Sequence, residues 1–419
     1  MSISRREALI GVGGAVVGGL ATKFAPTSIY HSAPLNVAEY REAARRRLPK
    51  IVFDYLDGGA GDELALRRNT EIFDRIEFRP ARLKDISKRD ISTELFGKTQ
   101  AAPIMVAPTG LNGSFWPDGD IALAKAAEEV GVPFALSTAS TTSMEDVAAN
   151  AGGDKWFQLY VLSRGIAESL VERALKAGYT KLILTTDVGI NGMRYRDARN
   201  GFKIPLPISP GLVWDGMTHP AWSLDFVLNG MPEMGNFASA DASNTEQQAV
   251  LMSRSMDATF DWAALRWLRE LWPHELLVKG ILRADDAVRC IDNGADAVIL
   301  SNHGGRQLGD APAPIQVLAE TRARISAPIL IDSGYRRGED IVKALALGAD
   351  TVLLGKAVLY GLSANGQAGA TDVLKILMKE IDNTLAQIQC PNVRDLTPEY
   401  VAAVDRSLMG PQGSDSSTS

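Results

Sequence analysis

A histidine and an arginine follow directly on an apolar run in the segment AVILSNHGGRQ, residues 297–307. The run 297–300 is typical of a strand that is buried on both faces. An imidazole such as that of His303 can accept and release a proton near neutral pH, and a guanidinium such as that of Arg306 can bind a carboxylate through two parallel hydrogen bonds. A strand followed by a Gly-Gly turn and a surface arginine would have the same sequence. The elements around this segment must therefore decide between this structural interpretation and the functional one.

Eight short apolar runs of this kind alternate with helix-like segments such as 119–130, 166–177, 284–293 and 338–347. Several of these segments end in a glycine, as helices commonly do. Eight strand–helix units predict an α/β fold of the (β/α)8 TIM-barrel type. A doubly wound sheet is the alternative, but no G-x-G-x-x-G motif follows an early strand. The predicted strands are 103–107, 133–137, 156–160, 181–185, 275–279, 297–300, 328–332 and 351–355.

The chain divides into a leader, a barrel domain and a tail. Residues 1–35 hold Arg5-Arg6 before an uncharged Gly/Ala/Val stretch, which is typical of a twin-arginine export signal. The barrel domain, 36–397, begins with a helical extension that includes a predicted helix over 62–78. A last helix is predicted over 372–389, and residues 398–419 form a polar tail.

An insertion at 206–253, after the fourth predicted strand, is too long for an ordinary connection. It is rich in Pro, Gly, Met and Trp and contains neither Lys nor Arg. It is predicted either to form a membrane or partner surface or to pack on itself as a loop.

Composition excludes several functional classes. The formal net charge of −6, without a basic stripe, argues against a nucleic-acid partner. The two cysteines, Cys290 and Cys390, provide no disulfide framework. The four histidines are not clustered at metal-ligand spacing, so no metal site is predicted.

Polar residues collect at the ends of the predicted strands, where barrels of this type build their sites. Asp187 and Tyr160 end two of them, and Arg194 follows the fourth strand. Two arginines at one mouth, Arg194 and Arg306, predict an anionic substrate, most simply a carboxylate. An aspartate beside His303 would hold the imidazole in one tautomer and make it more basic.

The other strand ends predict a cofactor. Lys279 ends a buried strand and could stabilise negative charge on a reduced ring. Gly334, Arg336 and Gly355 follow the last two strands, where barrels often bind a phosphate group.

The motifs SNHGGRQ (301–307), DSGYRRG (332–338) and WFQLY (156–160) resemble those of the FMN-dependent α-hydroxy acid oxidases and dehydrogenases. The resemblance covers about 36–397. Within the family, the chain is most similar to the bacterial membrane-associated (S)-mandelate dehydrogenases. The stretches PTGLNG (108–113), LTTD (184–187), WSLDFV (222–227) and LWPH (271–274) carry that similarity.

The resemblance implies a role for each matching residue. His303 would take a proton from the substrate, and Asp187 would stabilise the imidazolium. Arg306, Arg194 and the Tyr55 hydroxyl would hold the carboxylate, while Tyr160 would contact the substrate oxygen. FMN would be held by Gly110, Ser137, Gln158, Thr185, Lys279, Ser301, Asp332, Arg336, Gly355 and Lys356.

The resemblance also implies oxidation of a 2-hydroxy acid, (S)-mandelate or a related aromatic acid, by a homotetramer that passes electrons to a membrane quinone or electron-transfer component. Two alternatives are an oxidase of the lactate or glycolate type that forms hydrogen peroxide and a non-catalytic FMN-binding module, which would have no need of a base. The resemblance implies association with the bacterial inner membrane. The leader predicts the periplasmic face, with the cytoplasmic face as the alternative.

Two features depart from the family pattern. Lys356 stands where the family usually has arginine, so a backbone contact to phosphate would persist but a guanidinium contact would not. The insertion lacks the basic residues that the membrane-binding segment of the mandelate dehydrogenases carries.

Overall fold

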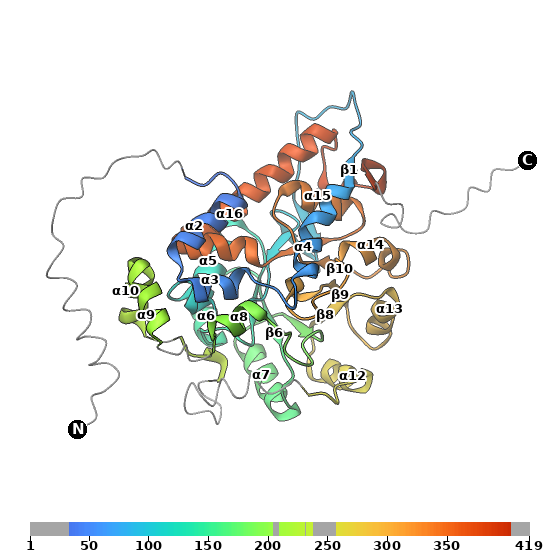
Figure 1. Ribbon diagram of the computed structural model, residues 1–419. Coiled ribbons are helices and arrows are strands. Elements are labelled where there is room, and N and C mark those ends of the chain that lie inside the picture. Colours follow the sequence, from blue (N-terminus) through green and yellow to red (C-terminus); the bar gives the residue numbers. More distant parts are fainter. Residues whose placement is uncertain (1–32, 204–208, 231, 238–256, 404–419) are drawn as a thin grey trace, which may run out of the picture.

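The computed structural model describes residues 33–203, 209–230, 232–237 and 257–403 (Figure 1). The predicted leader lies outside the described residues except for its last three positions. Parts of the insertion and most of the predicted tail also lie outside them.

The centre of the molecule is a closed barrel of eight parallel strands in the order β10-β11-β4-β5-β6-β7-β8-β9. Every predicted apolar run supplies one strand, and the predicted TIM barrel is confirmed. The strands are short because only their apolar middles lie in the barrel wall, and their polar ends project from its mouth. Their bounds are β4 Ile104–Val106, β5 Phe134–Ser137, β6 Lys155–Leu159, β7 Lys181–Thr185, β8 Glu275–Ile281, β9 Ala297–Leu300, β10 Ile329–Ile331 and β11 Thr351–Leu354.

Helices surround the barrel (Figure 1). The last of them is much longer than predicted, running as α16 over Lys356–Ile388 with a break at Asn365 and Gly366. The ring of Trp116 packs against the backbone at this break, a contact that no local sequence pattern announces. The other outer helices are α5 Gly119–Val130, α6 Met144–Asn150, α7 Arg164–Lys176, α12 Trp262–Leu271, α13 Ala284–Asp292, α14 Ile315–Arg322 and α15 Gly338–Ala346.

A helical extension precedes the barrel, as predicted, with α2 Val37–Arg47, α3 Lys50–Asp57 and α4 Leu64–Glu71. The prediction of a single helix over 62–78 is wrong for its carboxyl-terminal part. After α4, a 3-10 turn leads into β1 Ile76–Phe78, which pairs antiparallel with β12 Val401–Ala403. The folded body therefore reaches Ala403, beyond the predicted boundary at Thr397.

One end of the barrel is closed by a hairpin of β2 Thr93–Leu95 and β3 Lys98–Gln100. Phe96 at its turn packs edge-on against Trp156, and Leu95 joins the side chains inside the barrel. Because β6 begins next to Trp156, the hairpin covers the amino-terminal ends of the strands and leaves the opposite mouth for a site.

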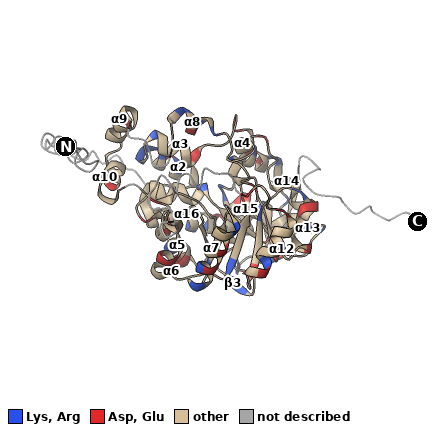
Figure 2. Cartoon of the chain, turned by 90° about the horizontal axis from the view of Figure 1, so that it is seen from below, with Lys and Arg blue, Asp and Glu red and all other residues tan. Residues whose placement is uncertain are grey.

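The described part of the insertion is helical, with α9 Pro210–Thr218 and α10 Pro220–Asn229 standing out from the body (Figures 1 and 2). Three polar contacts fasten this α9–α10 hairpin to the helical extension and to the loop after β4. Asp225 pairs with Arg47, the Lys50 backbone N–H donates to Asp215, and Trp222 Nε1 donates to the Ser114 carbonyl. The outward side of the hairpin is apolar, with exposed Val213, Trp214, Met217, Leu224, Val227 and Leu228.

Among the described residues, the structure contains no helix with the length and apolar character needed to cross a bilayer.

Candidate active site

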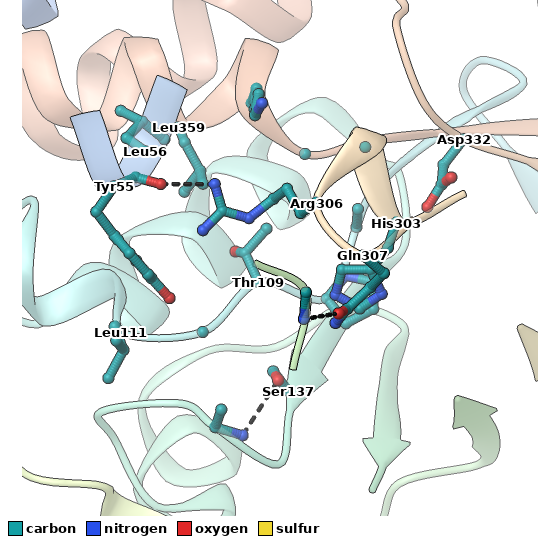
Figure 3. Close-up of a pocket in the computed structure, with 18 of the residues that line it drawn as sticks. Tyr55, Leu56, Thr109, Leu111, Ser137, His303, Arg306, Gln307, Asp332 and Leu359 are labelled. Carbon is teal, nitrogen blue, oxygen red and sulfur yellow. Dashed lines mark hydrogen bonds between the residues drawn. The ribbon is translucent and has the colours of Figure 1, made fainter. Parts of the chain in front are cut away.

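A cavity of about 790 Å3 opens at the carboxyl-terminal mouth of the barrel. All but four of the predicted site residues line it: Tyr55, Gly110, Ser137, Tyr160, Arg194, Lys279, His303, Arg306, Asp332, Arg336, Gly355 and Lys356. The other four, Gln158, Thr185, Asp187 and Ser301, lie directly behind this lining and hydrogen-bond to residues within it or to each other. Figure 3 shows Tyr55, Arg306 and His303 facing the cavity from separate segments.

His303 lies just after β9, where its backbone adopts a left-handed conformation with φ of 58°. Such a conformation costs free energy for a residue other than glycine and is frequent at functional sites. Nδ1 of the ring lies 2.9 Å from Oδ1 of Asp187, which follows β7. Nε2 lies 3.5 Å from the hydroxyl of Tyr160, which also lines the cavity. Nδ1 is therefore occupied by the carboxylate, and Nε2 is left for a ligand.

The backbone of Gly280 makes room for Asp187. A Cβ at Gly280 would lie only 2.7 Å from the Cβ of Asp187, and φ at this glycine is 107°. The strand register shifts at this point, between Lys279 and Ile281. Such a bulge redirects side chains next to functional sites.

Asp187 remains a carboxylate despite its burial. Burial alone would raise its pKa, but the charges of His303 and Lys279 outweigh that effect and leave the pKa lowered. An ionised Asp187 can stabilise a protonated imidazole.

Two arginines meet beside Tyr55. Arg306 Nη1 donates to the carbonyls of Tyr55 at 2.6 Å and Gly58 at 3.0 Å, and its guanidinium lies 4.8 Å from the centre of the Tyr55 ring. Arg194 Nε donates to the Arg306 carbonyl at 3.3 Å. Burial and the nearby charge of Arg194 lower the pKa of Arg306 to about 10. A carboxylate would relieve the repulsion between these two cations.

Tyr160 is a neutral hydrogen-bond donor at this end of the cavity. Burial, together with the negative charge of Asp187, raises the pKa of its hydroxyl. Its backbone N–H donates to the Thr138 hydroxyl at 3.0 Å, which fixes the start of the loop that carries it.

A polar row lies along the barrel wall from β5 to β7. Ser137 Oγ donates to Gln158 Oε1 at 2.9 Å, and Gln158 Nε2 donates to Thr185 Oγ1 at 2.9 Å. The three side chains are buried and orient one another. Gln158 and Thr185 thereby fix the orientation of Ser137, which lines the cavity.

Lys279 ends this row and is only 4% exposed. Its Nζ lies 2.8 Å from Asp332 Oδ2 and 2.7 Å from Ser301 Oγ. Burial acts to lower the pKa of Lys279, but the carboxylates of Asp332 and Asp187 outweigh it, so the pKa is raised. Ser301 Oγ also accepts the His303 backbone N–H at 3.0 Å, which links the lysine to the histidine loop.

A further cation, Lys356, lies beside Arg306, and the two side chains donate to the same Gly58 carbonyl. Lys356 Nζ donates to the carbonyls of Asp57 and Gly58, each at 2.9 Å. Burial and the charges of Arg306 and Arg336 lower the pKa of Lys356 well below its ordinary value. A buried group of cations of this kind is suited to a phosphate.

The loop after β10, which carries Arg336, also brings Gly334 to the cavity. Gly334 has φ of 102°, and a Cβ there would lie 1.9 Å from the Asn69 carbonyl oxygen. Only glycine fits this position.

Several cavity residues were missed by reading the strand ends. Asn69 comes from α4 and exchanges two hydrogen bonds with Asn302, at 2.9 and 2.6 Å. Phe202 stacks on Tyr55 at 4.3 Å, and Met234 comes from the insertion. These residues reach the mouth from the extension, from the segment after α8 (Tyr195–Asn200) and from the insertion, where neither periodicity nor motif marks them.

Comparisons with known proteins agree with this geometry. The family model described as "FMN-dependent dehydrogenase" matches residues 44–403. The (S)-mandelate dehydrogenase of Pseudomonas putida is 57% identical over 366 residues, which cover 87% of this chain and 93% of that protein.

Solved structures of mandelate-oxidising proteins are also similar to this chain. A crystal structure of the monotopic membrane protein (S)-mandelate dehydrogenase is 56% identical, with a TM-score of 0.87, and the match covers 89% of this chain and 100% of that one. A mutant of mandelate oxidase with (S)-mandelic acid is 34% identical, with a TM-score of 0.75, over 88% of this chain and 98% of that one. The chain therefore belongs to the FMN-dependent dehydrogenase family.

Proposed function

We propose that this enzyme oxidises an aromatic (S)-2-hydroxy acid, (S)-mandelate above all, to the corresponding 2-oxo acid. The observation that carries the proposal is the His303–Asp187 pair, which faces the same cavity as Arg194 and Arg306. A base and a carboxylate-binding pair in one cavity suit an acid that loses a proton next to its carboxylate. The names of the mandelate-oxidising relatives support the choice of substrate.

The cavity suits FMN, the cofactor of the family. The cation group at Arg336 and Lys356 would bind the phosphate, with Gly334 and Gly355 leaving room for close backbone approach. When bound, FMN supplies the acceptor for two electrons. The remaining contacts to it would come from Gly110, Ser137, Gln158, Thr185, Lys279, Ser301 and Asp332.

The substrate carboxylate would bind to the two arginines of the cavity, whose charges repel each other. Arg306 and Arg194 would bind the carboxylate, assisted by the Tyr55 hydroxyl, because an anion offsets their mutual repulsion. Tyr160, held neutral by its raised pKa, would donate a hydrogen bond to the hydroxyl oxygen of the substrate. These contacts would fix three of the substrate's atoms relative to His303.

Proton transfer would occur at Nε2 of His303, since Nδ1 is held by Asp187. The proton would come from the α-carbon if the bonding electrons first remain on the substrate, or from the hydroxyl if they leave with hydrogen as hydride. Both routes end with an imidazolium, whose charge the ionised Asp187 would offset.

The direct test is a panel of 2-hydroxy acids supplied to the purified flavoprotein with an artificial electron acceptor. Phenylglyoxylate is the expected product from (S)-mandelate, with little turnover of the R enantiomer. Absence of turnover with every acid of the panel would contradict the proposal.

The physiological electron acceptor is proposed to be a membrane quinone or another electron-transfer component. The membrane-associated relative supports this choice. The alternative is an oxidase, which the mandelate oxidase relative supports. Turnover of (S)-mandelate in air with a peroxide assay separates them: one equivalent of peroxide per product would favour the oxidase, and none would favour the quinone.

The α9–α10 hairpin is proposed as the membrane contact. Its outward side exposes large apolar side chains from both helices, and its two carboxylates, Asp215 and Asp225, bond to the body of the protein instead. Figure 2 shows neither Lys nor Arg on these helices. Burial of apolar surface, rather than attraction to anionic lipid, would therefore provide the affinity.

Sedimentation with phosphatidylcholine vesicles tests this surface. Trp214→Ser with Leu228→Ser should release the protein into the supernatant, whereas added anionic lipid should change binding little. Leu83→Ser, at a fully exposed leucine outside the hairpin, is the matched control. Unchanged sedimentation of the double variant would contradict the assignment.

The membrane side and the oligomeric state complete the proposal. The leader would direct the protein to the periplasmic face of the inner membrane, with the cytoplasmic face as the alternative, and the enzyme would form a homotetramer. Protease treatment of spheroplasts distinguishes the two faces, and light scattering of the purified protein in detergent measures the assembly.

A further inference from the structure

The cavity has an apolar wall that the proposed chemistry leaves unused. It is formed by Leu111, Phe115, Ala139, Leu162 and Met234. Four of the five are buried, and Leu162 is partly buried. We call these five residues the apolar wall.

The apolar wall lies beside the residues proposed to orient the substrate. Phe115 stacks on Tyr55 with ring centres 6.2 Å apart. Leu162 follows Tyr160 by two positions in the same loop. The Leu111 backbone N–H donates to the Ala139 carbonyl at 3.0 Å, which joins the loops after β4 and β5 into one surface.

Met234 is the one member of the wall that the insertion supplies, and it is 2% exposed. Its neighbour Asn236 is fully buried and makes several hydrogen bonds. Asn236 Oδ1 accepts the Met144 N–H at 2.9 Å, while its Nδ2 donates to the Ser140 hydroxyl at 2.9 Å and the Ser137 carbonyl at 3.1 Å.

Two backbone contacts hold the same turn. The Gly235 N–H donates to the Ser140 carbonyl at 3.1 Å, and Arg173 Nη1 donates to the Asn236 carbonyl at 2.6 Å. The turn at 234–236 is thus fixed to the loop after β5, which holds Met234 at the cavity.

We propose that Met234 determines substrate specificity by closing the subsite for the side chain on C2 of the 2-hydroxy acid, and that Asn236 positions it there. This inference rests on the proposed function. Arg306 and Tyr160 would bind the carboxylate and the hydroxyl, and the hydrogen on C2 is lost in the reaction, so one substituent of C2 remains. The apolar wall beside Tyr55 and Tyr160 is the surface that matches an aromatic substituent.

A methionine suits this position. Its unbranched thioether adapts to the shape of a ring and makes favourable sulfur–aromatic contacts. The methyl group of lactate is too short to use the same contact, so the side chain should discriminate between large and small substrates.

The test compares kcat/KM for (S)-mandelate and (S)-lactate in Met234→Ala. Loss of the thioether should lower the value for mandelate by about tenfold and leave that for lactate within about twofold, as expected for contacts in an apolar pocket. Met234→Trp should fill the subsite and reduce mandelate turnover more than lactate turnover. Met217→Ala, at an exposed methionine of the same insertion, should leave the mandelate-to-lactate ratio unchanged.

Asn236→Ala should shift the ratio in the same direction as Met234→Ala, mainly through KM for mandelate, because it loosens Met234 without touching the substrate. Equal losses for both substrates in these variants would show a structural role only and would overturn the inference. An unchanged ratio in Met234→Ala would overturn it as well. A wild-type enzyme that oxidises no 2-hydroxy acid would instead contradict the proposed function.

Discussion

Nδ1 of His303 lies 2.9 Å from Oδ1 of Asp187, although 116 residues separate them in the sequence. His303 follows β9 and Asp187 follows β7, and β8 lies between those strands in the barrel. The glycine bulge at Gly280 in β8 gives the aspartate the space to reach the histidine.

Replacing Asp187 by asparagine should lower kcat by at least about 10²-fold, because the amide keeps the shape but cannot offset an imidazolium charge. The pH profile of kcat/KM should change together with kcat, since the charge beside the base is lost. Steady-state kinetics from pH 5 to 9 measure both effects. Asp382→Asn, which breaks a surface pair with Arg89, is the control. Unchanged kinetics in Asp187→Asn would show that His303 works without its partner.

The affinity for a carboxylate inhibitor should depend on the charge of Arg306. Burial and Arg194 lower its pKa to about 10, so Arg306 is a cation below that pH and loses its proton above it. The Kd of phenylacetate, a mandelate analogue without the hydroxyl, should be constant from pH 7 to 9. Above pH 10 it should rise by about tenfold per pH unit.

Titration of the flavin spectrum with phenylacetate gives these constants. Arg306→Met should bind the inhibitor weakly and show no rise linked to this pKa. A constant Kd up to pH 11 in the wild-type enzyme would contradict the assignment of Arg306 to the carboxylate.

Lys279→Met should destabilise the protein by about 3–5 kcal/mol, because Asp332 would remain buried without its cation. The raised pKa of Lys279 gives the sign of the pH dependence: the pair stabilises the fold fully below the ordinary lysine pKa, and that contribution is lost as the pH rises through the raised value. Urea unfolding at pH 7 measures the difference. Lys176→Met, which breaks an exposed pair with Glu172, should cost less than about 1 kcal/mol. Similar losses for the two variants would contradict a buried pair.

Gly334→Ala should abolish tight FMN binding and lower the free energy of unfolding by more than about 2 kcal/mol, since its Cβ would collide with the Asn69 carbonyl. Flavin content after gel filtration reports the binding. Gly178→Ala is the matched control: its φ is also positive, at 81°, but its Cβ would meet nothing within 4 Å. The control should retain flavin and lose only about 1 kcal/mol. Normal flavin content in Gly334→Ala would contradict the proposal that the loop after β10 lies close to the phosphate of FMN.

The barrel and most of the cavity could be predicted because both follow from local patterns. A parallel strand buried on both faces is a continuous apolar run, and its polar end marks the mouth. His303, Asp187 and Arg306 follow such ends, and Lys279 lies two residues before the end of β8. The short strands β1 and β12 carry no such pattern, and only their pairing with each other reveals them.

The rest of the cavity depends on contacts between distant segments. Asn69 reaches Asn302 from a helix of the extension, and Met234 reaches the mouth because Asn236 is bonded to the loop after β5. The break in α16 likewise lies against the ring of Trp116, far away in the sequence. None of these contacts leaves a periodic signal at either partner.

Anaerobic single-turnover reduction of the flavin by (S)-mandelate tests the central claim most directly, in the wild-type enzyme and in His303→Gln. The wild-type absorbance should bleach rapidly. The variant should keep its flavin, because the side chain of His303 is assigned to the substrate rather than to FMN, and should be reduced about 10²- to 10⁴-fold more slowly. His274→Gln, on the opposite end of the barrel, should react like the wild type. Equally fast reduction in His303→Gln would show that another group is the base, and no bleaching of the wild type would contradict the account as a whole.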